Sequence, residues 1–201
     1  MYSLFYLIWP TCLIINHYKY KVPKKIFKNY LSFVHSMAGV FLSFWFIQSN
    51  YSNFLIRDTL YYFSKSYFIY DSSQIILSRK TSDSMLLVHH GLGIILLSGL
   101  YTYSEPLSIS YCILELSNFF NYIVYHMIKS HYSKYKILCM KLLQLIWVFY
   151  FRIYHIGKII YRELTTDYII IPALIIYILS LLWWGKQCKM VYYDLKKIKS
   201  N

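Results

Sequence analysis

Charged residues are scarce in this sequence. They make up 14% of its 201 residues, with only 8 acidic against 21 basic, whereas soluble proteins average about 25% charged residues. A soluble domain with so few charges could not cover its surface, so the composition favours an integral membrane protein. Alanine occurs only at Ala38 and Ala173, while Lys, Asn, Tyr, Ile and Phe abound. This bias is typical of an AT-rich genome, so the 24 Tyr and 13 Phe are weak evidence for ring-stacking chemistry.

Cysteines are few, and they lack a metal-binding pattern. The four show no CxxC or CxxH spacing and lie in or beside apolar stretches, so the sequence predicts neither a metal site nor a disulfide framework. They are Cys12, Cys112, Cys139 and Cys188. The net charge of +13 could indicate nucleic-acid binding, but the basic residues are spread between apolar segments instead of forming one patch. We therefore expect no nucleic-acid partner.

Seven apolar stretches are each long enough for a transmembrane helix, which needs about 20 predominantly apolar residues. They are residues 2–18, 30–49, 60–78, 84–104, 107–128, 138–160 and 168–189. The first is short and carries Pro10, and the third is the most polar, with Lys65 and Asp71. No internal repeat or long linker separates domains. The sequence therefore predicts an all-α transmembrane protein of about seven spans, folded as one bundle.

The basic residues of the loops fall mainly on one side of this bundle. The loops after the first, third and fifth stretches and the C-terminal tail hold most of the Lys and Arg, whereas the other loops contain only Arg57, Lys158 and Arg162. Because cytosolic loops carry an excess of Lys and Arg, we expect a lumenal N-terminus and a cytosolic C-terminus.

Both ends of the chain bear on location. A basic run follows the first stretch and no basic residue precedes it. A cleaved signal peptide has the opposite arrangement, so we expect the first stretch to remain as an anchor. The last five residues, Lys197-Ile198-Lys199-Ser200-Asn201, resemble the dilysine signal that returns membrane proteins to the endoplasmic reticulum. We therefore expect that location.

Polar residues inside the predicted spans form two stripes. A charged side chain at mid-bilayer costs about 2.5–3.5 kcal/mol on insertion scales, so each such residue is expected to have a partner or a function. In the fifth span, one helical face carries Glu115, Asn118, Tyr122 and His126, and in the sixth, an arc of about 80° carries Lys141, Gln144, Arg152 and His155. Glu115 and Arg152 fall at nearly equal depth, so we expect them to pair. The alternative is that this pair merely fixes the register of the two helices.

A second polar set lies nearer the cytosolic side. It consists of His35, Asp71, His89 and His90. Histidine is the usual general acid or base near neutral pH, and Asp71 could orient an imidazole. His89 and His90 point about 100° apart on a helix, so only one can face a given substrate atom. The alternative for each histidine is a hydrogen-bonded packing residue.

These residues also carry a family resemblance. The segment Tyr67-Phe68-Ile69-Tyr70-Asp71, followed by Met85-Leu86-Leu87-Val88-His89-His90, resembles the core of the TLC domain, which ceramide synthases share with other lipid-related membrane proteins. Further similar segments follow the order of that domain: residues 32–36, Glu115 to Ser117 with Asn121, residues 149–152 and residues 183–186. The resemblance covers about residues 28–192. It implies a six-helix barrel around a lipid-sized cavity, preceded by a span and basic loop at 1–27 and followed by a basic tail at 193–201.

The resemblance also implies site residues. In ceramide synthases the paired histidines belong to the acyl-transfer site, which implies catalytic roles for His89 and His90, with Asp71. Those enzymes then carry an HD-x-x-D motif where this chain has Leu114-Glu115-Leu116-Ser117-Asn118, so the histidine is missing. This departure resembles the non-synthase branch, whose members are linked to membrane lipid composition. The implied lining of the lipid cavity is His35, Glu115, Asn118, Asn121 and Arg152.

Three functions follow from these observations. The first is a protein that binds a membrane lipid or acyl chain and influences lipid composition, without a cofactor. The second is an acyltransferase that uses acyl-CoA as substrate and His89 or His90 as base or nucleophile. The third is a transporter or channel that uses the stripe of Glu115 and Arg152.

Overall fold

A computed structural model of the chain describes residues 2–78, 84–102, 105–163 and 170–199. Those residues form helices joined by short turns, and no strand occurs among them, which confirms the predicted all-α class. The chain divides into two compact units, Met1–Cys112 and Ile113–Asn201, which we describe one at a time.

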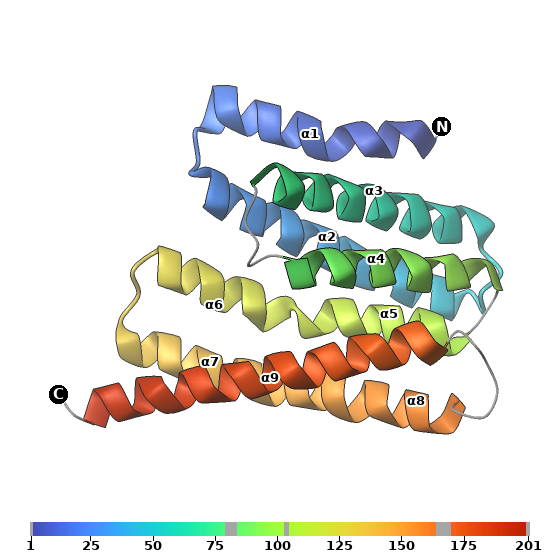
Figure 1. The fold of residues 1–201 in the computed structure, drawn as a ribbon. Helices are drawn as coiled ribbons and strands as arrows, with labels where there is room; N and C mark the ends of the chain where they lie inside the picture. Colours follow the sequence, from blue (N-terminus) through green and yellow to red (C-terminus); the bar gives the residue numbers. More distant parts are fainter. Residues whose placement is uncertain (1, 79–83, 103–104, 164–169, 200–201) are drawn as a thin grey trace. The chain divides into compact units, whose positions relative to one another are not determined.

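The first unit holds four helical segments and the start of a fifth. Its main helices are α1 (Phe5–Ile15), α2 (Lys24–Gln48), α3 (Phe54–Ser78), α4 (Ser84–Ser98) and the first part of α5 (Glu105–Ser117). The 3₁₀ turns η1 (Tyr2–Leu4) and η4 (Gly99–Thr102) and the π-helix η2 (Asn16–Tyr20) extend them. Successive helices of this unit run in alternating directions, and α3 packs against α1, α2 and α4 (Figure 1).

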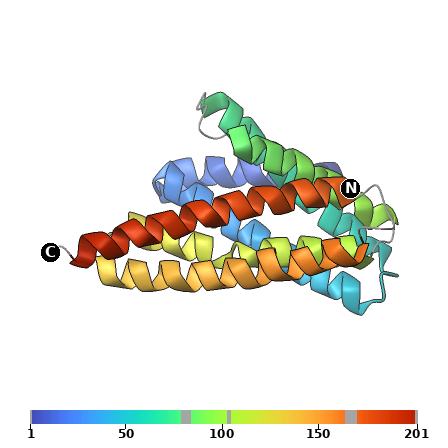
Figure 2. The same cartoon turned by 60° about the horizontal axis from the view of Figure 1, so that its bottom comes forward.

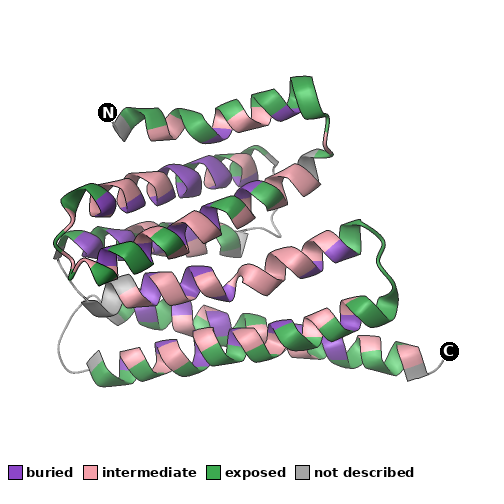
Figure 3. Cartoon of the chain, turned by 180° about the vertical axis from the view of Figure 1, so that it is seen from behind, coloured by how far each residue is buried: buried purple, intermediate pink, exposed green. Residues whose placement is uncertain are grey.

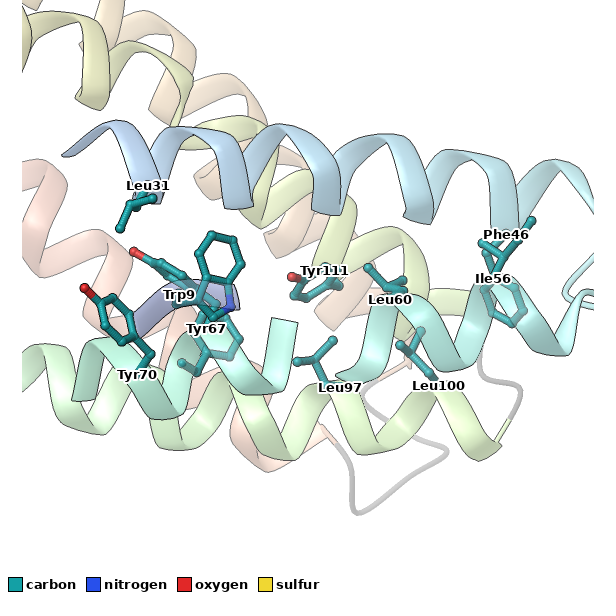
Figure 4. Close-up of a cluster of buried hydrophobic side chains, with 11 residues drawn as sticks. Trp9, Leu31, Phe46, Ile56, Leu60, Tyr67, Tyr70, Leu97, Leu100 and Tyr111 are labelled. Atoms are coloured by element: carbon teal, nitrogen blue, oxygen red, sulfur yellow. The ribbon is translucent and has the colours of Figure 1, made fainter. Parts of the chain in front are cut away.

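The core of this unit has an aromatic cluster toward one end and several leucines toward the other. Trp9 and Tyr67 lie together near Tyr70, while Leu97 and Leu100 pack beside Leu60 (Figure 4). Buried serines connect the helices at the core: the Trp9 Nε1 donates to Ser66 Oγ at 3.0 Å, and the Tyr111 hydroxyl donates to Ser64 Oγ at 2.7 Å. Small residues such as serine let helices approach closely in a membrane protein.

The second unit contains the end of α5 and the rest of the chain. Its elements are α6 (Phe119–Lys129), α7 (Lys134–Val148), the π-helix η5 (Phe149–His155), α8 (Ile156–Glu163) and α9 (Ile170–Lys199). Figure 2 shows α7, η5 and α8 as one continuous rod with α9 along it. The Lys141 Nζ donates to Asp194 Oδ2 at 2.6 Å, so the start of α7 and the end of α9 lie at the same end of the unit.

Polarity is distributed in the reverse of a soluble protein. Buried side chains include His35, Asp71, Glu115 and Arg152, whereas Phe41, on α2, is 72% exposed. Figure 3 shows exposed residues over much of α1, with buried residues in narrow stripes. Exposed apolar surface of this extent marks a contact with lipid or protein.

Three helices among the described residues are long and apolar enough to cross a membrane, judged by length and composition. They are Ile26–Gln48, Lys134–Arg162 and Ala173–Ile198, and Leu86–Tyr101 is apolar but shorter. The structure therefore supports a membrane protein.

Each of the seven predicted stretches lies on helix wherever the structure describes it, apart from Ser49 and Asn118. Residues 103–104 and 168–169 of these stretches, like Ser200 and Asn201 of the dilysine-like end, lie outside the described residues. At Asn118 the predicted fifth stretch breaks into α5 and α6. The domain boundaries predicted after residues 27 and 192 fall inside α2 and α9, so neither marks a linker.

Candidate functional site

Three helices of the first unit bring four polar side chains together. We call this group the α2–α4 cluster: Lys28 from α2, Asp71 and Ser72 from α3, and His90 from α4. Asp71 and His90 were predicted as site residues, and the structure places them in contact. Since α3 packs against both neighbours, its polar positions 71 and 72 face α2 and α4.

Asp71 is the centre of the cluster. It is 4% exposed, and the Lys28 ammonium lies 2.6 Å from its Oδ1 at an angle outside hydrogen-bond geometry, so the contact is an ion pair. A buried carboxylate stays ionised only when it is paired, because its desolvation is otherwise too costly. The Lys28 side chain is 33% exposed, so it links the buried Asp71 to the surface of the unit.

His90 lies with one ring nitrogen toward each of two neighbours on α3. Its Nδ1 is 3.1 Å from Ser72 Oγ, and its Nε2 is 3.6 Å from Asp71 Oδ2. The second distance is too long for a hydrogen bond but short enough for electrostatic attraction. The ring of Phe68 stacks on the imidazole at 5.3 Å and fixes its plane. His90 is therefore held between a hydroxyl and a carboxylate.

Two members of the cluster were missed by the sequence analysis. Ser72 could have been noticed because it follows Asp71 directly. Lys28 could not, since a lysine in a basic loop region gives no sign that it pairs with a residue of another helix.

His35 and His89 take different positions from that of His90. His35 is 1% exposed and lies among aromatic rings, stacked on Tyr67 at 4.0 Å and edge-on to Phe68 at 5.3 Å. Phe68 thus contacts both His35 and His90. Within the described part of the chain the Nε2 of His35 has no hydrogen-bond partner. His89 is half-buried, with its ring 5.9 Å from that of His90.

In the second unit, Arg152 ties the rod to the break between α5 and α6. The guanidinium is 3% exposed and donates to Ser117 Oγ at 2.9 Å, to Asn118 Oδ1 at 3.0 Å and to the Leu114 carbonyl at 3.3 Å. It also lies over the ring of Trp183, 5.5 Å from the centroid. Arg152 sits within the π-helix η5, an irregularity often found at special sites.

The polar contacts continue from Asn118 along α6. Asn121 Nδ2 donates to Asn118 Oδ1 at 3.3 Å, and Gln144 Nε2 donates to Asn121 Oδ1. We call the chain of Arg152, Asn118, Asn121 and Gln144 the α6–α7 network. Three of its members were predicted cavity residues, and Gln144 belonged to a predicted stripe.

The expected pairing of Glu115 with Arg152 takes a different form. Glu115 is buried and interacts electrostatically with the guanidinium, but the hydrogen bonds described for Arg152 go to neighbours of Glu115. The reason is the end of α5, where the Leu114 carbonyl and the side chains of Ser117 and Asn118 present acceptors to an incoming cation. The other cation of the sixth stretch, Lys141, pairs with Asp194 instead.

The predicted site residues therefore fall into two groups. Asp71, His89, His90 and His35 belong to the first unit, and Glu115, Asn118, Asn121 and Arg152 belong to the second. A surface depression lies around η2, lined by Leu13, Ile14, Asn16, His17, Tyr18, Lys21 and Val22, and it includes none of them. Among the described residues no three His, Cys, Asp or Glu side chains could hold a metal ion together.

Comparison of the chain with protein-family models, with curated proteins and with solved structures finds no match in any of the three. The resemblance to the TLC domain therefore stays a prediction that rests on its motifs.

Proposed function

We propose that this chain is a multi-pass membrane protein of the TLC type that binds a membrane lipid or acyl chain between its helices and thereby influences lipid composition. The observation that carries the proposal is the inverted polarity: ionisable groups such as Asp71 and Arg152 are buried, while large apolar side chains are exposed. Such groups inside a bilayer face the protein interior and mark functional positions.

Seven crossings are the arrangement that we propose. With 25 residues, α3 reaches about 37 Å at 1.5 Å per residue, longer than the bilayer core of about 30 Å. Its charged residues, Lys65 and Asp71 among them, make α3 less hydrophobic than a helix that crosses a membrane alone. A polar helix can cross when other helices cover it, and α1, α2 and α4 do so here.

We also propose the orientation with a lumenal N-terminus and a cytosolic C-terminus, in the endoplasmic reticulum. In each unit, taken alone, basic side chains gather at one end. In the first unit Lys19 and Lys21 lie just before α2, and Lys28 lies near its start. In the second unit Lys134 and Lys136 lie at the start of α7. The pairing of Lys141 with Asp194 brings the basic end of α9 to the same side. Excess Lys and Arg mark the cytosolic side.

His35 is the group that we assign to the bound lipid. Its Nε2 has no hydrogen-bond partner among the described residues, and an unsatisfied polar atom inside a membrane protein is costly. The hydroxyl or ester group of a lipid could satisfy it. The surrounding Trp9, Phe63, Tyr67 and Phe68 offer the apolar surface that an acyl chain needs.

Lipid analysis after purification in mild detergent tests this assignment. We expect wild-type protein to retain a defined lipid through size-exclusion chromatography, and His35→Phe to retain much less of it. The matched control is His155→Phe, since His155 is half-buried among rings of its own helix, Tyr150, Phe151 and Tyr154. Equal retention by wild type and His35→Phe would refute the role of His35, and a wild-type protein without bound lipid would refute the proposed function.

Acyl transfer from acyl-CoA is the second candidate, because His90 lies between a hydroxyl and a carboxylate. Purified protein incubated with labelled acyl-CoA and amine or hydroxyl acceptors tests it. We expect His90→Ala to abolish turnover and His89→Ala to reduce it less, since His90 contacts Asp71 and Ser72. Absence of turnover with any acceptor would remove this candidate.

A further inference from the structure

We propose that Ser72 is a nucleophile that carries the acyl group as an ester, with His90 as its general base and an acyl thioester as the substrate. This inference rests on the acyl transfer proposed above. It adds a residue outside the predicted site and a covalent intermediate.

The contacts of His90 match the arrangement of a nucleophile, a general base and a group that orients the base. When the imidazole proton is on Nε2, which faces the Asp71 carboxylate at 3.6 Å, the Nδ1 can accept a hydrogen bond from Ser72 Oγ at 3.1 Å. Nucleophilic hydroxyls need an adjacent base that is oriented by a third group. Asp71 supplies that group, and the ion pair with Lys28 holds its carboxylate in place. Asp71 and Lys28 act as positioning residues.

Ser72 differs from Ser66 and Ser73 of the same helix in where its hydroxyl points. Ser66 donates to the Phe63 carbonyl at 2.7 Å and Ser73 donates to the Tyr70 carbonyl at 2.6 Å, which is the common behaviour of serine in a helix. The hydrogen bond described for Ser72 instead goes to an imidazole on α4. Its hydroxyl is therefore directed at a base and not at its own backbone.

The position of the cluster fits a substrate with an anionic head and an apolar tail. Asp71 and Ser72 lie about 10 Å from the end of α3 at Ser78, at 1.5 Å per residue. Lys28 pairs with Asp71 from the start of α2, so the exposed Lys19 and Lys21 of the preceding segment lie at the same end. Phosphates of acyl-CoA would meet these cations while the thioester reaches the serine.

The chemical step balances without an oxidant or a metal. Ser72 Oγ forms a bond to the thioester carbonyl carbon as its proton passes to His90 Nδ1. The carbon–sulfur bond then breaks, and the leaving thiolate takes the proton from His90. An acceptor hydroxyl, amine or water molecule next attacks the acyl-serine, with His90 as base again, and the proton returns to Ser72 Oγ.

Mass spectrometry of the full-length protein in detergent micelles tests the proposal with palmitoyl-CoA as the probe. After a rapid acid quench, we expect a palmitoyl ester on the peptide containing Ser72, together with release of free CoA thiol. Ser72→Ala should form no adduct, and His90→Gln should form it about 100-fold or more slowly. Ser73→Ala is the matched control and should react as wild type, because Ser73 is exposed and its described hydrogen bond goes to the Tyr70 carbonyl of its own helix.

A second variant keeps the test decisive if Ser72→Ala misfolds. Ser72→Cys retains a nucleophile, and we expect its acyl adduct to be a thioester that neutral hydroxylamine cleaves, unlike the ester of the wild type. An adduct on His89, His90 or another residue, or wild-type CoA release by Ser72→Ala, would overturn the role of Ser72. Absence of both adduct and CoA release overturns it too. In that case, a wild-type protein that still co-purifies with lipid would keep the lipid-binding proposal. A wild-type protein without bound lipid would refute both the lipid-binding and the acyl-transfer proposals.

Discussion

In the second unit, Arg152 directs its donors at acceptors of Leu114, Ser117 and Asn118, whereas in the first unit the equally buried His35 leaves its Nε2 without a partner among the described residues. Both residues are polar and buried among apolar helices, but their hydrogen bonding differs. A fully satisfied network stabilises one packing arrangement. A partly satisfied one costs stability and keeps groups available for a ligand.

This difference assigns separate roles to the two groups of residues. The α6–α7 network fixes the register of the rod against the broken helix α5–α6, so we regard it as structural. The α2–α4 cluster provides the imidazole of His90 and the hydroxyl of Ser72, and His35 provides the Nε2 that is unpaired within the described part of the chain. These groups can bind a ligand or take part in a reaction. Stability should therefore depend more on the second unit, and function more on the first.

Removing Arg152 should have the largest effect on stability. Arg152→Met removes three buried hydrogen bonds, to Leu114, Ser117 and Asn118, and takes the nearby cation away from Glu115. Losing one partner of a buried charged group costs about 3–5 kcal/mol. Reversible unfolding in mixed detergent micelles measures this loss. The control is Lys158→Met on the exposed face of α8, which should unfold as wild type. A loss for Arg152→Met as small as for the control would show that the network is not structural.

Removing Lys28 should cost less, because its side chain is partly exposed and water can replace it. Lys28→Met leaves the buried Asp71 carboxylate without its cation, an unsatisfied group that costs about 1–3 kcal/mol. The double variant Lys28→Met with Asp71→Asn should recover part of the loss, because the uncompensated charge is gone. A double-mutant cycle on unfolding free energies measures the coupling. Strictly additive losses would mean that the two side chains do not interact in the folded protein.

How far the sequence predicts these groups depends on the range of the interaction. Helical period alone placed Glu115 and Asn118 on one face and put Gln144 and Arg152 on another, because residues on one helix have fixed angles. Ion pairs between helices were harder to predict from the sequence. The pairs Lys28 with Asp71 and Lys141 with Asp194 join residues far apart in the chain. Those contacts depend on helix packing and rotamers, which periodicity does not contain.

Local breaks were missed for a similar reason. The apolar run 107–128 reads as one helix, yet it breaks at Asn118, where the guanidinium of Arg152 binds the side chain. The π-helical turn that contains Arg152 was equally invisible, since nothing in Phe149–His155 opposes a regular α-helix. Both irregularities coincide with the contact between Arg152 and Asn118, and a local pattern does not contain that contact.

A neutral hydrogen bond in the core should contribute less than either charged group. Trp9→Phe keeps the apolar ring but removes the bond from Nε1 to Ser66 Oγ that ties α1 to α3, a loss of about 1 kcal/mol. Trp45→Phe is the matched control, because Trp45 is exposed, and it should be unchanged. Both variants remove a tryptophan and so change the fluorescence signal itself. Thermal unfolding is therefore best followed by circular dichroism. Equal melting temperatures for both variants would show that this bond does not stabilise α1.

The smallest effect on stability should come from His35→Phe, although His35 is among the most buried residues of the chain. Replacing a buried polar group that lacks a partner by an apolar ring of similar shape is nearly neutral or stabilising. The new ring would stack on Tyr67 as the imidazole does, while lipid retention falls. That combination, unchanged or raised stability with lost binding, is the expected sign of a site that sacrifices stability for function. A large destabilisation by His35→Phe would instead make His35 a structural residue like Arg152, and the contrast between the two units would disappear.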